Sequence, residues 1–561
     1  MNVSGRGLEE GAAEVITRRK VAWIAIFAIA LLAIVGCGGG ASSSSNDQPS
    51  SKLTIDTPPG NQSVEKVVWA LPNGEPNLID PARGGDYSPD TVEANLCESL
   101  LQVQPDYSLK PNLAEKWDQV NPTTLVFTIR PGVKFWDGKP LTAEDVAYSL
   151  RRNTEPSVQP VYSGAYESVK SVTATGPLQV TVKFTKPDAA FLPAIASMAG
   201  AISEKAFVEK AGKEYGTAAD GVMCTGPYKF GSWASGDHLT ITRNEDYWNP
   251  ELTPKVKEVE FKFISNNSTL SNALLSGEVE GTYEVPTTSL SALANSSVGK
   301  VYLGPSTEWL VLGPVSSTGP GADPRIRQAL SLSIDKSLFI KNALEGAGEP
   351  LKTFTTPFLW SGNPAKAIYQ KGYDALPDES PNIQKAKQLV KEADPSTRTL
   401  TVATTAGNQL EEQLATLVQG SAKELGLTVK IKVMQPAEVY ELFFNAERRK
   451  EVDFLATTGF YEAPTPLYMA NGFIYKGGIV NWIGYNNPTA TKELEAAYAS
   501  LDPKKSAEHF VKAQSVWYKS TVVCAFAVAY ERLFMNSKIS GAPASIGYLT
   551  YPWAARLGGT G

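Results

Sequence analysis

The sequence predicts a two-lobed α/β protein that acts outside the cytoplasm. Three observations support this prediction: the chain has 561 residues, strand-like and helix-like segments alternate along it, and an apolar run lies near its N-terminus. A single hydrophobic core stops growing at about 250–300 residues, so at least two lobes are expected. The mixture of strands and helices favours α/β architecture over an all-β sandwich or a helical array.

The N-terminal segment resembles an export signal. Residues 21–36 read VAWIAIFAIALLAIVG, and the basic cluster 17–20 (TRRK) precedes them. An uncharged run of this length after a basic flank is typical of a secretory signal, since a membrane span needs about 20 apolar residues. A permanent transmembrane anchor is the alternative, and Arg18-Arg19 leaves twin-arginine export open beside the general secretory route.

The apolar run ends in Ile34-Val35-Gly36-Cys37, which resembles the lipobox of bacterial lipoproteins. There the cysteine sulfur receives a diacylglycerol and becomes the new N-terminus, and two acyl chains anchor stably where one would be marginal. An apolar cysteine that merely ends the run is the alternative. Residues 38–64 are rich in Gly, Ser, Pro and Asn, which predicts a flexible tether. Residues 1–37 are thus expected to be a lipoprotein signal peptide, and the body to be lipid-anchored at the outer face of the cytoplasmic membrane.

The composition narrows the class of protein. The chain is 42% hydrophobic and 20% charged with a net charge of −6, so it can bury a core, and it lacks the basic face that nucleic-acid binding needs. His238 and His509 are its two histidines, too few for a His-based metal site. Its four cysteines form no CxxC pair. No nucleic acid, metal or cofactor is therefore expected.

Local patterns place the first elements. Residues 67–71 (VVWAL) predict a short buried strand, and residues 123–130 (TTLVFTIR) alternate as a strand does. Thr142 is expected to cap a helix, because Asp145 stands three residues on, as in a capping box. Residues 410–434 predict a helix and then a strand, with Gly426 ending the helix.

Longer segments resemble the family 5 extracytoplasmic solute-binding proteins, the dipeptide, oligopeptide and nickel receptors of ABC importers. The resemblance runs from about residue 65 to the C-terminus. It rests on residues 113–117 (LAEKW), 124–152 (TLVFTIRPGVKFWDGKPLTAEDVAYSLRR), 225–228 (TGPY), 236–238 (GDH), 243–248 (RNEDYW), 323–338 (DPRIRQALSLSIDKSL) and 481–488 (NWIGYNNP).

This resemblance implies the fold of periplasmic binding proteins of class II, also called cluster C, with an enlarged first lobe and a ligand cleft between the lobes. The first lobe would comprise residues 65–305 and 520–561, and the second lobe residues 306–519. Ligand would close the cleft about a hinge, and no bond would be broken. A small peptide would be the cargo, the permease and ATPase subunits of an importer would be the partners, and the protein would be a monomer.

Candidate ligand contacts follow from the same resemblance. Peptide-binding members meet the ligand ammonium with an acidic residue in a segment similar to residues 453–468 here, where Glu462 stands in place of the usual aspartate-rich turn. A solvated loop glutamate is the alternative, and a blocked or cyclic peptide would need no such charge. Tyr87, Trp309 and Tyr461 are expected to line the cleft with Glu462, although Trp309 suits a packed core equally well.

The cysteines of the first lobe are expected to pair. Cys97 and Cys224 both lie in segments of the resemblance, and disulfides persist outside the cytoplasm, so a Cys97–Cys224 bridge is predicted. Cys524, within the apolar run VVCAFAVAY, is expected to be a buried free thiol.

Other classes of function remain as alternatives. The same fold can bind a nickel chelate, haem or an oligosaccharide, or can serve a sensor. A membrane-anchored hydrolase rests only on Ser333-Ile334-Asp335-Lys336, which fits the SxxK pattern without its partner motifs SDN and KTG.

Overall fold

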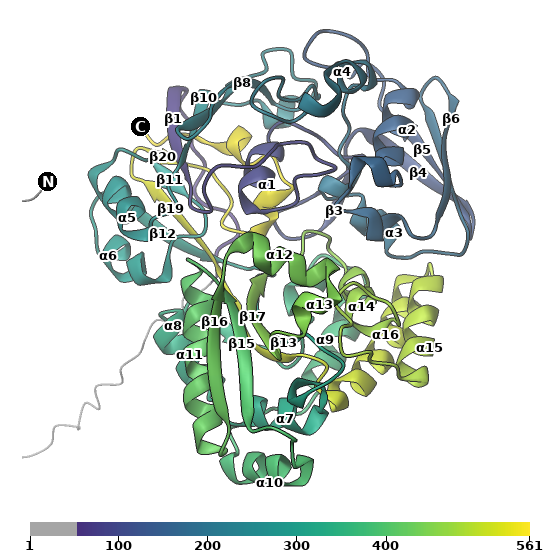
Figure 1. Cartoon of the computed structure of the whole chain (residues 1–561). Coiled ribbons are helices and arrows are strands. Elements are labelled where there is room, and N and C mark those ends of the chain that lie inside the picture. Colours follow the sequence, from purple (N-terminus) through teal and green to yellow (C-terminus); the bar gives the residue numbers. More distant parts are fainter. Residues whose placement is uncertain (1–52) are drawn as a thin grey trace, which may run out of the picture. The chain divides into compact units, whose positions relative to one another are not determined.

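The computed structural model describes residues 53–561 (Figure 1). The signal peptide, the lipidation site predicted at Cys37 and most of the predicted tether lie outside the described residues. Residues 51–561 form one compact unit. In residues 53–561, no helix is both long enough and apolar enough to cross a membrane.

The last part of the predicted tether is structured, because it pairs with the body. The Thr54 amide donates to the Leu303 carbonyl at 2.8 Å, and the buried Thr57 hydroxyl donates to the Ala542 carbonyl at 2.7 Å. Gln62 then forms a β-bridge with Gly559. The prediction of a tether up to residue 64 was therefore wrong for residues 54–62, whose polar groups bond to Leu303 and to the C-terminal segments.

The first lobe is built on a seven-stranded sheet. Its parallel centre, β1 beside β10 and β11, buries Val67, Trp69 and Leu71, so the predicted strand at residues 67–71 is confirmed. In sheet order the strands are β12 (Gly299–Gly304), β19 (Glu531–Asn536), β11 (Gly281–Thr282), β1 (Val64–Leu71), β10 (Val256–Phe263), β9 (His238–Arg243) and β8 (Tyr228–Ala234). In Figure 1 the late strand β19 lies among the early strands.

A four-stranded antiparallel sheet enlarges this lobe, in the order β4 (Ala114–Asn121), β5 (Thr124–Ile129), β7 (Gln179–Phe184) and β6 (Val169–Gly176). Helix α2 (Ala143–Arg152) packs against β6 and β7, and Thr142 and Asp145 form the predicted capping box at its start. The small pairs β2 (Leu101–Val103) with β3 (Leu109–Pro111), and β20 (Ile539–Ser540) with β21 (Gly558–Gly559), complete the strands of the first lobe.

The second lobe is built on a six-stranded mixed sheet. Its order is β14 (Gly348–Pro350), β18 (Cys524–Ala529), β13 (Trp309–Pro314), β17 (Phe454–Gly459), β15 (Thr399–Thr405) and β16 (Thr428–Met434). Helix α11 (Gln409–Glu424) packs against β15, β16 and β17. Gly426 follows it with a φ of 74°, so the predicted helix, glycine stop and strand are all present.

The chain crosses between the lobes at two short segments. Residues 305–308 join β12 to β13, and Tyr530 alone joins β18 to β19. The sequence places the return to the first lobe at residue 520, whereas the structure places it about ten residues later. The reason is that the run CAFAVA of β18 is buried throughout between β13 and β14 of the second sheet.

Most of the remaining helices surround the two larger sheets. The first lobe has α1 (Tyr87–Glu93), α3 (Phe191–Ala194), α4 (Lys205–Ala211), α5 (Asn267–Ser276) and α6 (Leu290–Ala294). The second lobe has α7 (Pro324–Leu332), α8 (Lys336–Ala343), α9 (Lys366–Asp374), α10 (Ile383–Ala393), α12 (Pro436–Phe444), α13 (Ala446–Arg449), α14 (Pro466–Ile474), α15 (Pro488–Ala499) and α16 (Pro503–Trp517). The family-like helix at residues 323–338 is two helices, because Asp335 caps α8.

The predicted disulfide between Cys97 and Cys224 is present, with 5.0 Å between the two Cα atoms. Cys524 is a buried free thiol, also as predicted, and burial raises its pKa to about 12.

Candidate functional site

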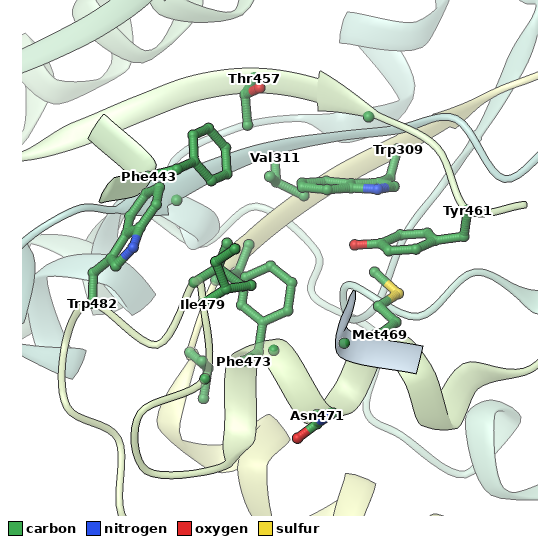
Figure 2. A pocket seen from close by; sticks show the side chains of 18 of the residues that line it. Trp309, Val311, Phe443, Thr457, Tyr461, Met469, Asn471, Phe473, Ile479 and Trp482 are labelled. Atoms are coloured by element: carbon green, nitrogen blue, oxygen red, sulfur yellow. The ribbon is translucent and has the colours of Figure 1, made fainter. Parts of the chain in front are cut away.

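The larger of two neighbouring cavities, about 560 Å³, lies mainly in the second lobe and is closed on one side by the first (Figure 2). That volume falls in the range of small-molecule sites. The second lobe supplies its strands β13 and β17, helix α14 and the loop before α15, and the first lobe supplies residues between α2 and β6. The walls include Val161, Ser163, Glu167, Trp309, Val311, Phe443, Leu455, Thr457, Thr458, Gly459, Tyr461, Tyr468, Met469, Asn471, Phe473, Ile479, Val480, Trp482, Ile483, Val522 and Val523.

Trp309 and Tyr461, two predicted ligand contacts, form one wall of this cavity. Their rings are stacked, with centroids 5.8 Å apart and an interplanar angle of 13° (Figure 2). Trp309 begins β13 opposite Gly459 of β17, and a Cβ at Gly459 would lie only 3.0 Å from the indole. The glycine therefore leaves room for the indole beside the strand.

The loop that carries Tyr461 is fixed from two sides. The Thr307 hydroxyl, in the hinge, accepts a hydrogen bond from the backbone N–H of Tyr461 at 3.0 Å and donates one to the backbone carbonyl of Tyr461 at 2.9 Å. The Tyr107 hydroxyl, in the first lobe, donates to the same carbonyl at 2.6 Å. The position of the Tyr461 ring therefore depends on the hinge and on both lobes.

Further aromatic walls were not predicted from the sequence. Phe443 of α12 and Trp482 pack edge to face at 5.2 Å at the end of the cavity away from Trp309 (Figure 2). Phe473 of α14 packs edge to face on Trp309 at 6.3 Å. Two features of the sequence could have drawn attention to these rings: Trp482 lies in the family-like segment 481–488, and Phe443 is followed by a second phenylalanine. Neither feature shows which way a ring points.

The larger cavity offers few polar groups and little charge. Glu167 is the one charged side chain on its described walls, and it accepts from the Asn471 amide at 3.2 Å. The indole nitrogens of Trp309 and Trp482 are buried without a hydrogen-bond partner. Each N–H is therefore an unpaired donor, which costs free energy because it is buried.

A smaller cavity of about 170 Å³ adjoins the larger one, because Tyr461 and Tyr468 line both. Its walls come from both lobes: Tyr162, Ala165, Ala194, Ser197 and Ala199 from the first, and Phe460, Tyr461, Glu462, Ala463 and Tyr468 from the second.

Glu462, the predicted partner of a ligand ammonium, lines this smaller cavity. Its two carboxylate oxygens accept from the Tyr162 hydroxyl at 3.0 and 3.1 Å. Burial raises the pKa of Glu462 to about 7, and the hydrogen bond from Tyr162 counteracts part of that rise. A nearby cation would lower this pKa and stabilise the charged form.

Two further acids, missed in the sequence, lie beside Glu462. Asp90 and Glu93 of α1 are fully buried, and none of their four carboxylate oxygens accepts from a donor group, although the Asp90 and Glu462 carboxyls are close enough to interact with each other. Burial raises the pKa of Asp90 well above its ordinary value, and the charge of Glu462 adds to the rise. The pKa of Glu93 is also raised, first by burial and then by Asp80. Nothing in the sequence marked Asp90 and Glu93 as buried acids, because an acidic residue in a helix is usually exposed to solvent.

Tyr87, the fourth predicted contact, lies just behind these walls. It is the first residue of α1, and its ring packs on Phe460 with centroids 4.3 Å apart. Phe460 lines the smaller cavity, whereas Tyr87 lines neither, and its buried hydroxyl has no partner.

The geometry gives no support to metal binding or to SxxK hydrolysis. Within residues 53–561, no group of three or more His, Cys, Asp or Glu side chains is placed to hold a metal ion. The Ser333 hydroxyl donates to the Leu330 carbonyl at 2.9 Å, and the Lys336 ammonium pairs with Glu379 at 3.1 Å. Each side chain of that motif therefore has a structural partner.

Residues 108–481, more than half of the chain, match the family model described as bacterial extracellular solute-binding proteins, family 5, middle part. The chain belongs to this family. Family 5 proteins bind peptide-like and other solutes outside the cytoplasm for the permease and ATPase of ABC importers, and they are not enzymes.

Curated relatives of this family 5 protein include two peptide receptors. The glutathione-binding protein GsiB of Salmonella paratyphi A is 23% identical over 452 residues, covering 79% of this chain and 85% of GsiB. The oligopeptide-binding protein AppA of Bacillus subtilis is 26% identical over 526 residues, covering 88% and 90%.

Solved structures confirm the fold of the family. AppA from Bacillus subtilis, in complex with a nonapeptide, has a TM-score of 0.76 at 21% identity, covering 90% of this chain and 100% of AppA. NikA from Staphylococcus aureus, in complex with Ni(L-His)₂, has a TM-score of 0.71 at 19% identity, covering 86% and 98%. The prediction of a two-lobed binding-protein fold is therefore correct.

Proposed function

We propose that this family 5 protein captures a peptide between its lobes, closes around it and delivers it to the permease of an ABC importer. The proposal rests above all on the two adjoining cavities, whose walls come from both lobes and include Glu462. Support also comes from the relatives GsiB and AppA, which are named for glutathione and oligopeptides.

Glu462 would receive the ammonium of the peptide. Its carboxylate already accepts from a first-lobe hydroxyl, so a ligand cation there would contact groups of both lobes. Asp90 and Glu93 lie behind it, and a ligand cation would lower their raised pKa values and so favour their charged forms. Trp309 and Tyr461 would contact the body of the peptide through their ring faces.

Closure would turn on the two crossings. The Arg532 guanidinium, just after Tyr530, donates to the Glu308 carboxylate of the other crossing at 3.1 Å, and both side chains are buried. This ion pair ties the two crossings together, so the lobes would move as bodies about one point.

The membrane attachment belongs to the same proposal. The lipidated Cys37 would hold a monomeric receptor at the outer face of the cytoplasmic membrane, and the tether up to residue 53 would let it reach the permease. Expression of the full chain with labelled palmitate tests this: the wild type would carry the label, and Cys37→Ser would lose it.

Native mass spectrometry tests the capture of a peptide. Residues 51–561 form one compact unit with every described strand and helix, so this segment is purified gently and weighed before and after denaturation and refolding. A mass excess that disappears on refolding and fragments as peptide supports the proposal, and the mass reports the monomer. An excess that fragments as a metal chelate, haem or a sugar would replace the peptide with that solute.

A further inference from the structure

The walls of the larger cavity select against negative charge. None of the described residues that line either cavity is Lys, Arg or His, and the acids Glu167 and Glu462 line the larger and the smaller one. A carboxylate entering the larger cavity would lose its hydration without gaining a cationic partner, which is strongly unfavourable.

The same walls suit a large apolar group. Rings of Trp309, Tyr461, Phe473, Phe443 and Trp482 follow one another around the space (Figure 2). Aromatic walls prefer stacked or edge-to-face contacts with other rings, and they also bury aliphatic groups. A volume of about 560 Å³ falls in the range of sites that hold a small molecule.

The apolar surface continues from the cavity to the outside. Ile479 lines the cavity and is 57% exposed. Phe443, inside, contacts the ring of Phe444, which in turn contacts Tyr440, and these two outer residues of α12 are 64% and 63% exposed. An apolar group can therefore enter over these residues, while the nearby Arg449 guanidinium lies 5.5 Å from the centre of the Trp482 ring and is engaged with the Leu442 carbonyl.

The polar atoms of the cavity define what else the ligand carries. The indole N–H groups of Trp309 and Trp482 are inaccessible, and the one charged group on the described walls is the Glu167 carboxylate, an acceptor. The group preferred in the larger cavity is thus apolar and uncharged.

This inference rests on the proposed function. We infer that the cargo is a peptide-like solute with a large, uncharged, apolar side chain, preferably an aromatic one. That side chain would fill the cavity formed by Trp309, Phe443 and Trp482. Anionic peptides are excluded. Glutathione, which gives GsiB its name, carries two carboxylates and no large apolar side chain, so it is expected to be a poor ligand of this protein.

Isothermal titration calorimetry with matched tripeptide amides tests this inference on refolded residues 51–561. Phe, Leu, Ala or Glu is placed at each of the three positions in turn, with Ala elsewhere, and glutathione is titrated separately. At one position Phe is expected to bind at least about tenfold more tightly than Ala, because burying such a side chain stabilises binding by that factor or more. Glu at that position and glutathione are expected not to bind at 1 mM.

A charge at the mouth of the cavity provides the mutational arm. Ile479→Lys changes an exposed residue, so the fold is retained, and it is expected to narrow the preference for Phe over Glu at least about fivefold. Leu338→Lys, on α8 and 53% exposed, is the matched control and should leave the preference unchanged.

The possible outcomes separate this inference from the proposed function. If peptides bind but Glu peptides or glutathione bind as tightly as Phe peptides, the charge selection is wrong while peptide capture stands. If no tripeptide binds, both proposals fail together. If the wild type prefers Phe peptides over Glu peptides and Ile479→Lys shows the same preference, the Phe side chain of the ligand lies outside this cavity.

Discussion

The Tyr162 hydroxyl of the first lobe donates to both carboxylate oxygens of Glu462 in the second lobe, at 3.0 and 3.1 Å. This contact joins the lobes at the wall of the smaller cavity. Under the proposed function, this neutral donor holds the carboxylate that would receive the ligand cation, in a contact that exists only when the lobes are together.

Removing that hydroxyl should weaken closure. Tyr162→Phe is expected to reduce the affinity for a bound peptide about three- to tenfold, because a hydrogen bond to a charged group contributes about 1.5–3 kcal/mol when fully buried and less when partly exposed. Calorimetry measures the change. Tyr302→Phe, on β12 and at neither cavity, serves as the control. Equal affinity of Tyr162→Phe and wild type would show that the contact plays no part in binding.

The acids between the lobes predict a dependence on pH. The pKa of Glu462 rises from its ordinary 4.5 to about 7 through burial, beside Asp90, Glu93 and Asp86 of the first lobe. Below about pH 4.5 the carboxyl is protonated in both the folded and the unfolded state, so folding loses nothing. As pH rises towards 7 the unfolded chain loses the proton first, and the free energy of unfolding falls.

Thermal unfolding of the ligand-free protein between pH 5 and 8 measures this loss. Glu462→Gln should remove at most about 1.4 kcal/mol per pH unit of the wild-type slope, less because Glu462 is partly exposed. Burial also raises the pKa of Glu531 to about 7, so the unfolding free energy of the variant should still fall as pH rises, but less steeply than in the wild type. Glu65→Gln, with an 82% exposed side chain, controls for charge alone. Identical slopes for Glu462→Gln and wild type would contradict the prediction.

The hinge ion pair should be essential for stability. Arg532→Met leaves Glu308 buried without its partner, beside Glu284 and Glu531, and is expected to cost about 3–5 kcal/mol of unfolding free energy in urea. The double variant Glu308→Gln with Arg532→Met should recover part of that loss, because no unpaired Glu308 charge remains. Lys257→Met breaks the exposed pair with Glu65 and should change little. If Arg532→Met and Lys257→Met lost similar amounts of unfolding free energy, the hinge pair would have no special role in stability.

The disulfide should stabilise the first lobe. Cys97 and Cys224 are 127 residues apart, and closing a loop of that length stabilises by about 4–5 kcal/mol in the chain-entropy model. The double variant Cys97→Ala with Cys224→Ala should therefore unfold at lower urea concentration. Thiol titration of residues 51–561 should find one free thiol after denaturation, Cys524, and three after reduction. Three before reduction would mean that the bridge does not form.

The candidate contacts should differ in their effects. Trp309→Ala and Tyr461→Ala each remove an aromatic wall of the larger cavity and should weaken peptide binding about tenfold or more. Tyr87→Phe removes only a buried hydroxyl without a partner, so affinity should be unchanged and thermal stability equal or higher. A large loss of affinity in Tyr87→Phe would place Tyr87 in direct contact with the ligand.

Local rules recovered much of the fold from sequence. The capping box of Thr142 and Asp145, the glycine stop at Gly426 and the buried strand around Trp69 depend on neighbours in the chain, and all three are present. The pairing of Cys97 with Cys224 followed from the resemblance to the family. Trp309, Tyr461 and Glu462, which were predicted as ligand contacts, line the two cavities. Their roles in binding stay predictions.

The sequence by itself determined the family and the two-lobed α/β class, because these follow from segment patterns, and the resemblance to the family in turn implied the disulfide. Only the tertiary structure decided that Asp90 and Glu93 lie against Glu462, that Phe443 and Trp482 close an aromatic cavity, and that β18 stays in the second sheet until Tyr530. These relationships join residues that are not neighbours in the chain, and Asp90 and Glu462 are hundreds of positions apart. They depend on which face of each helix or strand the packed lobes turn inward, and no local pattern carries that information.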